Sequence, residues 1–265
     1  MNFIVGEKML GWIKKKIKRL NLSLKHKQER WKTKILLRKL YLHYRKTHII
    51  GASFSQYGQD LFIKTFFNYK PQKEEYFFVD IGANDGFALS NTYGLEKDLV
   101  QKWKGILIEA DPDIFQECIK NRPNTPKYNV ALCNTDGEVE FMQIQGPQML
   151  SGIVSEYSQE HLERIYREIE ECNGSYEIIK LQGAKFSTIM KNFPEVREID
   201  YLSIDVEGGE MAILKSIDFD QHKILVIGIE DNYPETSGIE KFLCEKGYKK
   251  IARLGCDSFF ELKMA

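Results

Sequence analysis

The chain of 265 residues is 43% hydrophobic and 12% aromatic, which is enough apolar material for a sizeable buried core. Its formal charge of zero, from 38 basic and 38 acidic side chains, hides an uneven distribution. Residues 1–50 carry 15 Lys and Arg against two acidic residues, so they hold a net charge of +13 and residues 51–265 hold −13. No apolar stretch reaches the roughly 18 residues of a membrane span, and we expect no signal peptide.

The cysteines indicate the redox environment. They are odd in number, widely spaced and never arranged as a Cys-x-x-Cys pair, which argues against a zinc cage or a disulfide framework. We therefore expect reduced thiols and a cytoplasmic location. The five residues are Cys118, Cys133, Cys172, Cys244 and Cys256.

Residues 1–50 form a basic leader, which we separate near Gly51 from a second domain, residues 51–265. Between residues 9 and 24, apolar side chains recur every three or four positions while lysines fall mostly off that stripe, a pattern that predicts a basic amphipathic helix. A second helix is expected over 31–44. The first helix suits an anionic membrane surface, which would place the protein at the inner face of the membrane, or it packs as an arm on the acidic domain. No RNA-binding signature is found, so we expect no nucleic-acid partner.

Residues 51–265 alternate between strand and helix patterns. The expected strands are 76–81, 105–110, 129–133, 201–206, 224–230 and an antiparallel pair at 248–254 and 259–262, with a hairpin at Asp136-Gly137 leading into 139–142. The expected helices run from Asn91 to Trp103, from the Asp111-Pro112 cap onward, over 158–172 and over 239–246. Strands that are apolar on both faces and alternate with helices indicate an α/β fold with a doubly wound, mostly parallel, Rossmann-like sheet.

The loop after the first strand, Val79–Gly86, suggests a ligand site, because ligands bind at the carboxyl ends of strands in such sheets. Gly82 and Gly86 permit a tight turn, yet the loop matches neither the dinucleotide fingerprint nor the P-loop. Its carboxylates, Asp80 and Asp85, would repel a pyrophosphate and suit a cationic ligand such as S-adenosylmethionine. Glu109 ends the next strand, where a carboxylate can bind a ribose diol. Alternatively, Asp80 and Glu109 cap loop amides.

The order of several motifs resembles the FkbM-type S-adenosylmethionine-dependent methyltransferases over about residues 53–262. The matching segments are Ser55–Leu61 (SQYGQDL), Val79–Gly86 (VDIGANDG), Gly105–Asp111 (GILIEAD), Asn129–Leu132 (NVAL) and Asp200–Glu210 (DYLSIDVEGGE). The resemblance implies a class I methyltransferase fold with a seven-stranded sheet. The insert 146–177 matches nothing in the family pattern that we can place, and Ala110 stands where many members have proline.

The resemblance also implies the residues of an S-adenosylmethionine site. The methionine part would lie against Asp80, Gly82, Ala83, Asn84 and Gly86. The ribose would lie against Glu109, with Ala110 and Asp111 beside it, and the adenine against Val130 and Ala131. Asp205 would lie near the reacting methyl group.

Methyl transfer to a hydroxyl requires positioning and gains from a general base. None of the five histidines follows a predicted strand, so we expect the carboxylates there to act instead. Asp205 or Glu207 is the predicted proton acceptor, and Glu230 is the predicted hydrogen-bond acceptor for the substrate. Two alternatives remain: Asp205, Glu230, Asp231 and Asn232 bind Mg²⁺, or Glu207 and Glu210 serve only the positive end of the next helix.

These features together predict an S-adenosylmethionine-dependent O-methyltransferase. The leader and the resemblance suggest that its acceptor is a small molecule or a glycan, with a sugar hydroxyl of a cell-surface glycan or its lipid-linked precursor as the first choice. Two alternatives stay open. One is an NAD(P)-dependent enzyme on a related sheet, and the other is a non-catalytic adaptor docked on a membrane.

Overall fold

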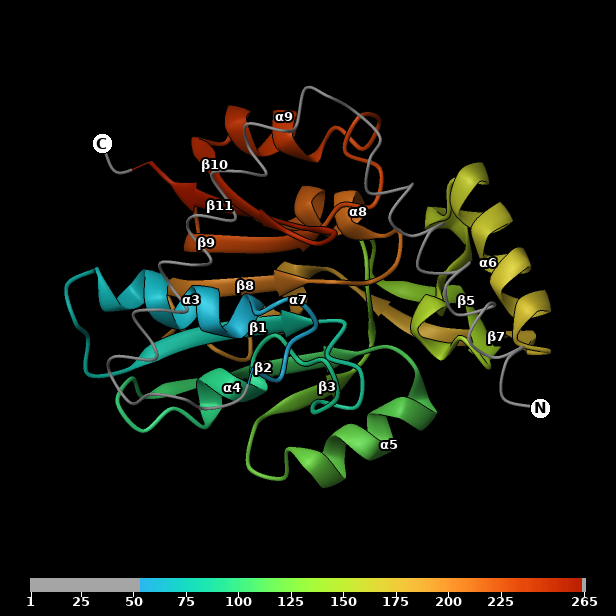
Figure 1. Ribbon diagram of the computed structural model, residues 1–265, viewed down its shortest axis with the longest axis horizontal. Coiled ribbons are helices and arrows are strands. Elements are labelled where there is room, and N and C mark those ends of the chain that lie inside the picture. The colour runs from blue at the N-terminus through green and yellow to red at the C-terminus, as the bar shows by residue number, and fades with distance from the viewer. Residues whose placement is uncertain (1–52, 264–265) are drawn as a thin grey trace, which may run out of the picture. The chain divides into compact units, whose positions relative to one another are not determined.

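The computed structural model describes residues 53–263 (Figure 1). The predicted leader helices, including residues 9–24, lie outside the described residues, so the leader and the domain boundary near Gly51 stay predictions. Across residues 53–263 we find no helix with the length and hydropathy of a bilayer span. The five cysteines all lie in this range, and all are free.

A seven-stranded sheet forms the centre of the described chain. Every neighbouring pair is parallel except those that involve β11, which runs antiparallel to both of its neighbours. In spatial order the strands are β10 (Tyr248–Leu254), β11 (Asp257–Leu262), β9 (Lys223–Glu230), β8 (Glu198–Ile204), β1 (Tyr76–Ile81), β2 (Trp103–Glu109) and β3 (Lys127–Asn129). From β1 the chain first builds β2 and β3 on one side and later β8 and β9 on the other. The predicted doubly wound, mostly parallel, seven-stranded sheet is therefore confirmed.

Helices cover both faces of this sheet. They are α3 (Gln59–Asn68), α4 (Tyr93–Glu96), α5 (Pro112–Asn121), α7 (Phe186–Met190), α8 (Glu210–Ser216) and α9 (Ile239–Glu245). On one face, Phe77 and Val79 of β1 share a core with apolar residues of α7, α8 and α9. On the other, α3 contributes Phe67, whose ring lies 5.2 Å from that of Tyr76, and α3 is seen in front of β1 and β8 in Figure 1. All six residues of β1 are buried, as expected for a strand covered on both sides.

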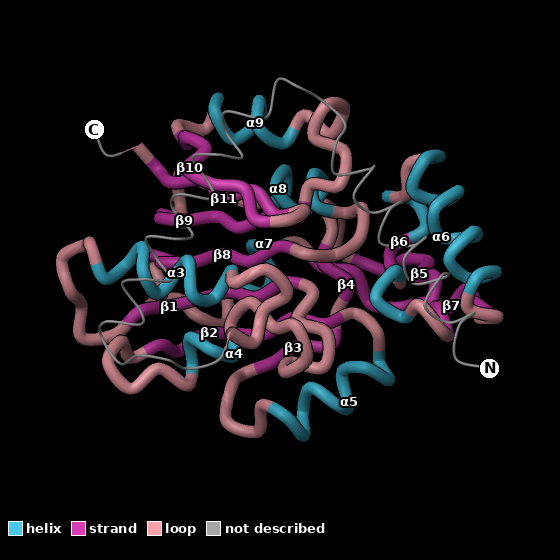
Figure 2. The backbone as a smooth tube through the Cα atoms, in the orientation of Figure 1, coloured by secondary structure: helices cyan, strands magenta, loops and turns pink. Residues whose placement is uncertain are grey.

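A smaller second sheet lies beside the first, and the sequence did not predict it. Its strands, in order, are β4 (Ala131–Leu132), β7 (Ser175–Ala184), β5 (Gly137–Gln145) and β6 (Gly152–Ile153) (Figure 2). The predicted hairpin segment after Asp136-Gly137 is β5, and its partner β7 was missed. The apolar residues of β7 change phase between Ile178 and Ile179, so no single alternating pattern runs through the strand.

The polar helix α6 (Gln159–Glu171) packs on this second sheet, close to its predicted span of 158–172. The Ser158 hydroxyl accepts a hydrogen bond from the His161 backbone N–H at 3.1 Å and caps the helix. His161, Ile165 and Ile169 recur every four residues and are buried. Two short 3₁₀ turns, η2 (Gln148–Leu150) and η3 (Val154–Glu156), connect β5, β6 and α6.

The predicted helix from Asn91 to Trp103 is wrong beyond its first turns. Only α4 is helical, Leu99 is 97% exposed, and Trp103 begins β2 with its ring stacked 4.8 Å from that of Tyr76. The Asp98 carboxylate accepts hydrogen bonds from the backbone of Val100 and Gln101, so the chain turns there. The four-residue spacing of Leu95, Leu99 and Trp103 therefore did not reflect a helix face.

The predicted strand 129–133 is divided between the two sheets. β3 ends at Asn129, whose side-chain amide donates hydrogen bonds to the carbonyls of Glu109 and Ala110. The chain then leaves the large sheet, and Ala131 pairs with Gly183 of β7. This crossover places the beginning of the second sheet beside the carboxyl end of β2.

The turn after β1 depends on a close backbone contact. Gly82 has φ +79°, and a Cβ atom built there would lie 1.7 Å from the carbonyl oxygen of Asp205. No side chain fits between the ends of β1 and β8 at this point. The glycine therefore serves the packing of two adjacent strand ends, rather than only the approach of a ligand.

Substitution of Gly82 tests this contact, with Gly58 as the matched control. Gly58 also has a positive φ, +85°, but no atom lies within 4 Å of a Cβ built there. Gly58→Ala should lower the free energy of unfolding by about 1–2 kcal/mol from backbone strain alone. Gly82→Ala should lower it by at least about 2 kcal/mol more, because overlap is added to strain. Equal losses in urea unfolding would contradict the close contact.

Candidate cofactor and catalytic site

A cavity opens at the carboxyl ends of β1, β2 and β8 and is bounded on one side by the second sheet. It holds about 1100 Å³ of empty space, including its opening to solvent. Its polar wall includes Asp80, Asn84, Asn91, Glu109, Asp205 and Glu207. Its apolar wall includes Ile108, Ile114, Val130, Ala131, Leu132, Phe141 and Ile153. The size and the mixed lining are typical of a small-molecule site.

Glu109 joins two loops at the rim of the cavity. One carboxylate oxygen accepts a hydrogen bond from the Asn84 backbone N–H at 2.7 Å, and the other accepts one from the Asp111 N–H at 2.8 Å. The carboxylate is thus an amide cap, as one interpretation of the sequence held. Each oxygen has a second lone pair, so the cap also leaves room for the predicted ribose contact. Burial raises the pKa of Glu109 to about 7.

Asp80 lies deeper, at the end of β1, and is 4% exposed. Its carboxylate accepts a hydrogen bond from the Thr92 hydroxyl at 2.6 Å, and Thr92 begins the segment that leads into α4. Burial raises the pKa of Asp80, while the Thr92 hydrogen bond and the nearby Arg122 guanidinium oppose that rise. The carboxylate therefore ties β1 to the next helical turn and also lines the cavity.

The structure places most of the predicted cofactor residues along the cavity. Asp80, Gly82, Ala83, Asn84, Glu109, Ala110, Asp111, Val130 and Ala131 all line it. Gly86 is not among the lining residues; a Cβ there would lie 2.8 Å from Arg122 Cγ, so this glycine packs against α5 and the residue that follows it. Asp85 accepts hydrogen bonds from the backbone of Phe87 and Ala88 and thereby shapes the turn.

Asn91 belongs to the site although the sequence suggested only a helix cap. Its side-chain amide donates to the Ser203 hydroxyl at 3.3 Å, whereas its buried Oδ1 has no hydrogen-bond partner. A buried acceptor without a partner is unfavourable, and the residue lines the cavity. Asn91 Oδ1 thus offers a bound ligand an acceptor for an N–H or O–H donor. No pattern around this single asparagine indicated its place in the cavity.

The three predicted catalytic carboxylates come together. One oxygen each from Asp205, Glu207 and Glu230 lies within 4.8 Å of the other two. Asp205 and Glu207 line the cavity, while Glu230 lies behind them at the end of β9. Burial, and to a lesser degree the nearby carboxylates, raise the pKa of all three, to about 8 for Glu207.

Glu207 sits on a strained turn and is held from the second sheet's side. Its φ is +53°, which is unusual for a residue other than glycine. Arg164 of α6 donates a hydrogen bond from Nη1 to Glu207 Oε2 at 3.2 Å, and His161 Nε2 lies 4.0 Å from the same oxygen. Helix α6, which belongs to the insert 146–177, therefore supplies the groups that contact the predicted proton acceptor.

The sequence did not predict a catalytic role for His161, because this histidine follows no predicted strand. It is 2% exposed, and burial lowers the pKa of its imidazole to about 4, so the ring is neutral at physiological pH. Its ring lies 5.2 Å from that of Tyr157. No sequence pattern links residue 161 to residue 207, because the second sheet that joins them was not predicted.

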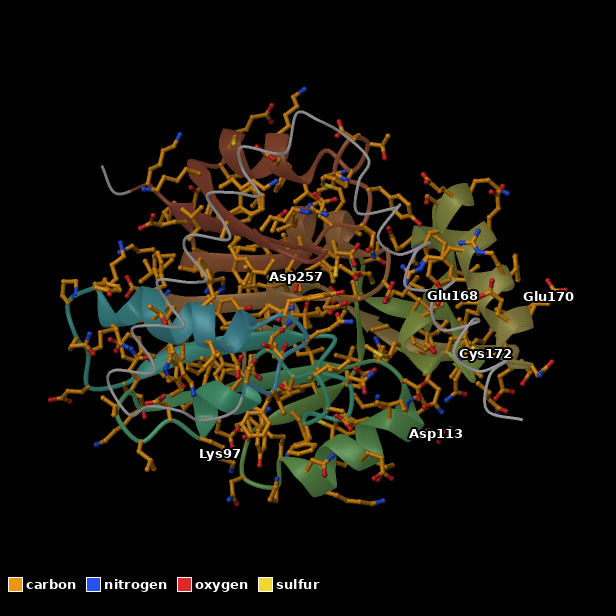
Figure 3. The ribbon with its side chains drawn as sticks, viewed as in Figure 1. Lys97, Asp113, Glu168, Glu170, Cys172 and Asp257 are labelled. Carbon is orange, nitrogen blue, oxygen red and sulfur yellow. The ribbon has the colours of Figure 1, made fainter. Side chains whose placement is uncertain are left out.

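The remaining acidic residues near the strand ends are arranged differently. Glu210 accepts hydrogen bonds from the Gly208 N–H, at 3.0 and 3.1 Å, and so closes the loop before α8. Asp257, labelled near the centre of Figure 3, accepts a hydrogen bond from Gln59. Asp231, which the sequence grouped with Asp205 and Glu230 for Mg²⁺, is buried but lies outside the cluster of three carboxylates that the described residues form.

Comparison with known proteins decides the family. A scan against protein families matches the Methyltransferase FkbM domain over residues 80–250, which is more than half of the chain. The chain belongs to the FkbM methyltransferase family. The match runs from β1 into β10, so the second sheet and the insert 146–177 lie inside the FkbM domain.

No curated protein sequence matches this FkbM-family chain. Three solved structures are similar to parts of it. Methyltransferase FkbM from Methylobacillus flagellatus KT is 13% identical with a TM-score of 0.44, over 74% of this chain and 46% of its own length. The METTL16 MTase domain is 12% identical with a TM-score of 0.41, over 76% of this chain and 64% of its own length. A TehB-like SAM-dependent methyltransferase from Corynebacterium glutamicum ATCC 13032 Kitasato is 11% identical with a TM-score of 0.39, over 85% of this chain and 97% of its own length. The chain thus spans less than two thirds of the first two structures.

The raised pKa of Glu207 predicts a pH-dependent stability. The Glu207 carboxyl has a pKa of about 8 in the folded chain, against an ordinary value of 4.5. Its contribution to the stability of the fold is therefore complete below pH 4.5 and is lost as the pH rises through 8. In buffer with a chelator, the unfolding temperature should fall by a few degrees between pH 6 and pH 8.5. Glu207→Gln should flatten this fall, whereas Glu163→Gln on the exposed part of α6 should leave it unchanged. A variant slope equal to that of the wild type would contradict the assignment.

Proposed function

We propose that the chain is an S-adenosylmethionine-dependent O-methyltransferase whose acceptor is a sugar hydroxyl of a surface glycan or of its lipid-linked precursor. The observation that carries this proposal is the convergence of Asp205 and Glu207 on one cavity with the predicted cofactor loop. Family membership supports the cofactor and the reaction class. The matched FkbM domain also argues against the NAD(P)-dependent alternative.

The groups along the cavity fit the parts of S-adenosylmethionine. Glu109 would hold the ribose hydroxyls, and Val130 and Ala131 would flank the adenine. Asp80 and the unpartnered Asn91 Oδ1 suit the cationic methionine part, because both are acceptors in a buried wall. When bound, the cofactor supplies an electrophilic methyl group on a sulfonium.

The acceptor hydroxyl becomes a nucleophile as it loses its proton. Glu207 suits this task, because a pKa of about 8 makes its ionised carboxylate a stronger base than an ordinary carboxylate. Arg164 fixes the Glu207 carboxylate from outside the cavity, and Asp205 lies beside it. In this proposal the proton passes from the acceptor oxygen to Glu207. Glu230 does not line the cavity, so the predicted hydrogen bond from the substrate to Glu230 is not part of the proposal.

The second sheet would supply the acceptor side of the site. Met149 and Ser151, in the connection between β5 and β6, and Ile153 of β6 line the cavity, and Met149 is 52% exposed. Such a wall limits water and offers both apolar and hydroxyl contacts to a sugar. We further propose that the basic residues 9–24 dock on an anionic membrane at its cytoplasmic face, where lipid-linked glycan precursors are presented.

Cofactor binding is tested by calorimetric titration of S-adenosylhomocysteine, the demethylated product. Asn91→Leu and Glu109→Gln should each weaken binding by about tenfold or more, since each removes or alters a buried acceptor. The matched control is Asp200→Asn. Asp200 is an equally buried carboxylate near the amino end of β8, where it accepts a hydrogen bond from the Phe77 N–H. Unchanged binding by both cavity variants, at equal unfolding temperatures, would remove the cofactor assignment.

Turnover is tested with methyl-labelled S-adenosylmethionine and a cell-envelope glycan fraction. The wild type should label the glycans, and Glu207→Gln should lower the rate by about 10²–10⁴-fold because the proton acceptor is lost. Its affinity for S-adenosylhomocysteine should stay within about threefold of wild type. Glu163→Gln serves as the control on α6. Labelling of a non-glycan fraction alone would refute the acceptor, and full activity of Glu207→Gln would refute the proton acceptor.

A further inference from the structure

We propose that a second cavity, at the amino ends of β8 and β9, binds a phosphate group that retains one proton, either as inorganic phosphate or as part of a phosphomonoester. This cavity lies at the edge of the large sheet opposite the cofactor cavity, which opens at the carboxyl ends of the strands. Phosphate binding there is independent of the proposed methyl transfer.

Three short segments form this phosphate cavity, which holds about 580 Å³ of empty space, including its opening to solvent. They are the end of α7 with the turn after it, the residues just before β8, and the residues just before β9. The apolar wall includes Met190, Phe193 and Val196, and the polar wall includes Lys191, Arg197 and His222. A cavity with this mixed lining can hold a small polar molecule.

His222 is the observation that points to a ligand in this cavity. It is 5% exposed, and its Nδ1 has no hydrogen-bond partner among the described residues. The rest of the ring is held in place, because the imidazole donates a hydrogen bond to the Val196 carbonyl and the Phe186 ring packs edge-on at 5.8 Å between centroids. A buried nitrogen without a partner is unfavourable unless a further group binds it.

The protonation state of the imidazole determines what Nδ1 can bind. Since Nδ1 has no partner, the hydrogen bond to the Val196 carbonyl comes from Nε2. Burial lowers the pKa of His222, so the ring is neutral at physiological pH. A neutral ring that carries its proton on Nε2 leaves Nδ1 as an acceptor. The missing partner is therefore a donor, such as an O–H group of the ligand.

The charge of the wall favours an anion. Lys191 and Arg197 line the cavity, and no acidic residue is among the described residues that line it. Within the described part of the chain, neither side chain forms an ion pair. The nearby Asp218 carboxylate accepts hydrogen bonds from the backbone N–H groups of Asp220 and Gln221 and so closes its own turn. Two cations without carboxylate partners therefore lie beside one acceptor that lacks a donor.

A phosphate group that keeps one proton meets both demands. Its charged oxygens accept from Lys191 and Arg197, while its P–OH donates to His222 Nδ1. Sulfate and carboxylate ligands are fully ionised near pH 7 and have no such donor. Phe193 and Val196 offer apolar contacts to the organic part of a phosphomonoester.

Inorganic phosphate is the probe. The full chain, near pH 7 in phosphate-free buffer of constant ionic strength, is titrated by calorimetry with phosphate, methyl phosphate and sulfate. The ¹⁵N signals of the histidine rings report whether His222 Nδ1 is engaged. One variant is His222→Gln, which keeps a donor for the Val196 carbonyl but lacks Nδ1, and the other is Arg197→Gln. The matched control is Arg167→Gln, because Arg167 is an exposed arginine on α6.

The wild type and Arg167→Gln should bind one phosphate per chain and shift the His222 Nδ1 signal. Both should bind sulfate at least about tenfold more weakly than phosphate, because sulfate leaves the buried acceptor without a donor. His222→Gln and Arg197→Gln should each weaken phosphate binding by about tenfold, and His222→Gln should also remove the preference over sulfate. Methyl phosphate should bind at least as tightly as phosphate if the natural ligand is a phosphomonoester, and more weakly if it is free phosphate.

Three results would overturn the phosphate site. They are an absence of saturable phosphate binding to the wild type, equal wild-type affinities for phosphate and sulfate, and an unchanged phosphate affinity in Arg197→Gln. Unfolding temperatures show whether each variant folds. If His222→Gln does not fold, the wild-type comparison of phosphate with sulfate and the ¹⁵N shift of His222 decide the role of Nδ1.

Discussion

Burial of carboxylates at the carboxyl edge of one sheet is the constraint on which the site depends. Transfer of a carboxylate out of water is unfavourable unless donors or cations replace the lost hydration. Asp80, Glu109 and Glu207 are each less than one tenth exposed, and each is partnered by a different segment. The partners are the Thr92 hydroxyl, the amides of Asn84 and Asp111, and the Arg164 guanidinium. The hydrogen bonds that compensate for the burial of these carboxylates therefore also fix the loops around the cavity.

The second sheet and the segments joined to it border the cavity of this FkbM-family domain. Tyr157 and α6 lie against the loop after β8, and α6 brings Arg164 and His161 to Glu207. Burial raises the pKa of the Glu207 carboxyl, and Arg164 of this insert opposes that rise. The segment that resembled nothing in the sequence is thus the one that sets the environment of the proposed proton acceptor.

The sequence predicted the elements whose signals are local. The bounds of β1 and β10 agree with the predicted 76–81 and 248–254, and Asp111 caps α5 through the amides of Asp113 and Ile114. A short apolar run predicts a strand, and a capping residue followed by proline predicts the start of a helix, each from only a few neighbouring residues. The large sheet follows from them, because alternating strands and helices allow few other arrangements.

Features that depend on distant contacts were not predictable in this way. The apolar residues of β7 change phase between Ile178 and Ile179, and the turn at Asp98 overrides the helical spacing that reaches Trp103. Among the site residues, Asn91 and His161 became visible only through their buried, unpartnered atoms. Gly86 shows the reverse case: it sits in the predicted loop, but it contacts Arg122 rather than the cavity.

The most direct test of the central claim is a crystal structure of the full chain with S-adenosylhomocysteine bound. We expect ribose hydroxyls on Glu109, adenine against Val130 and Ala131, and the sulfur facing Asp205 and Glu207. A ligand bound outside this cavity, or one whose sulfur points away from those carboxylates, would contradict it.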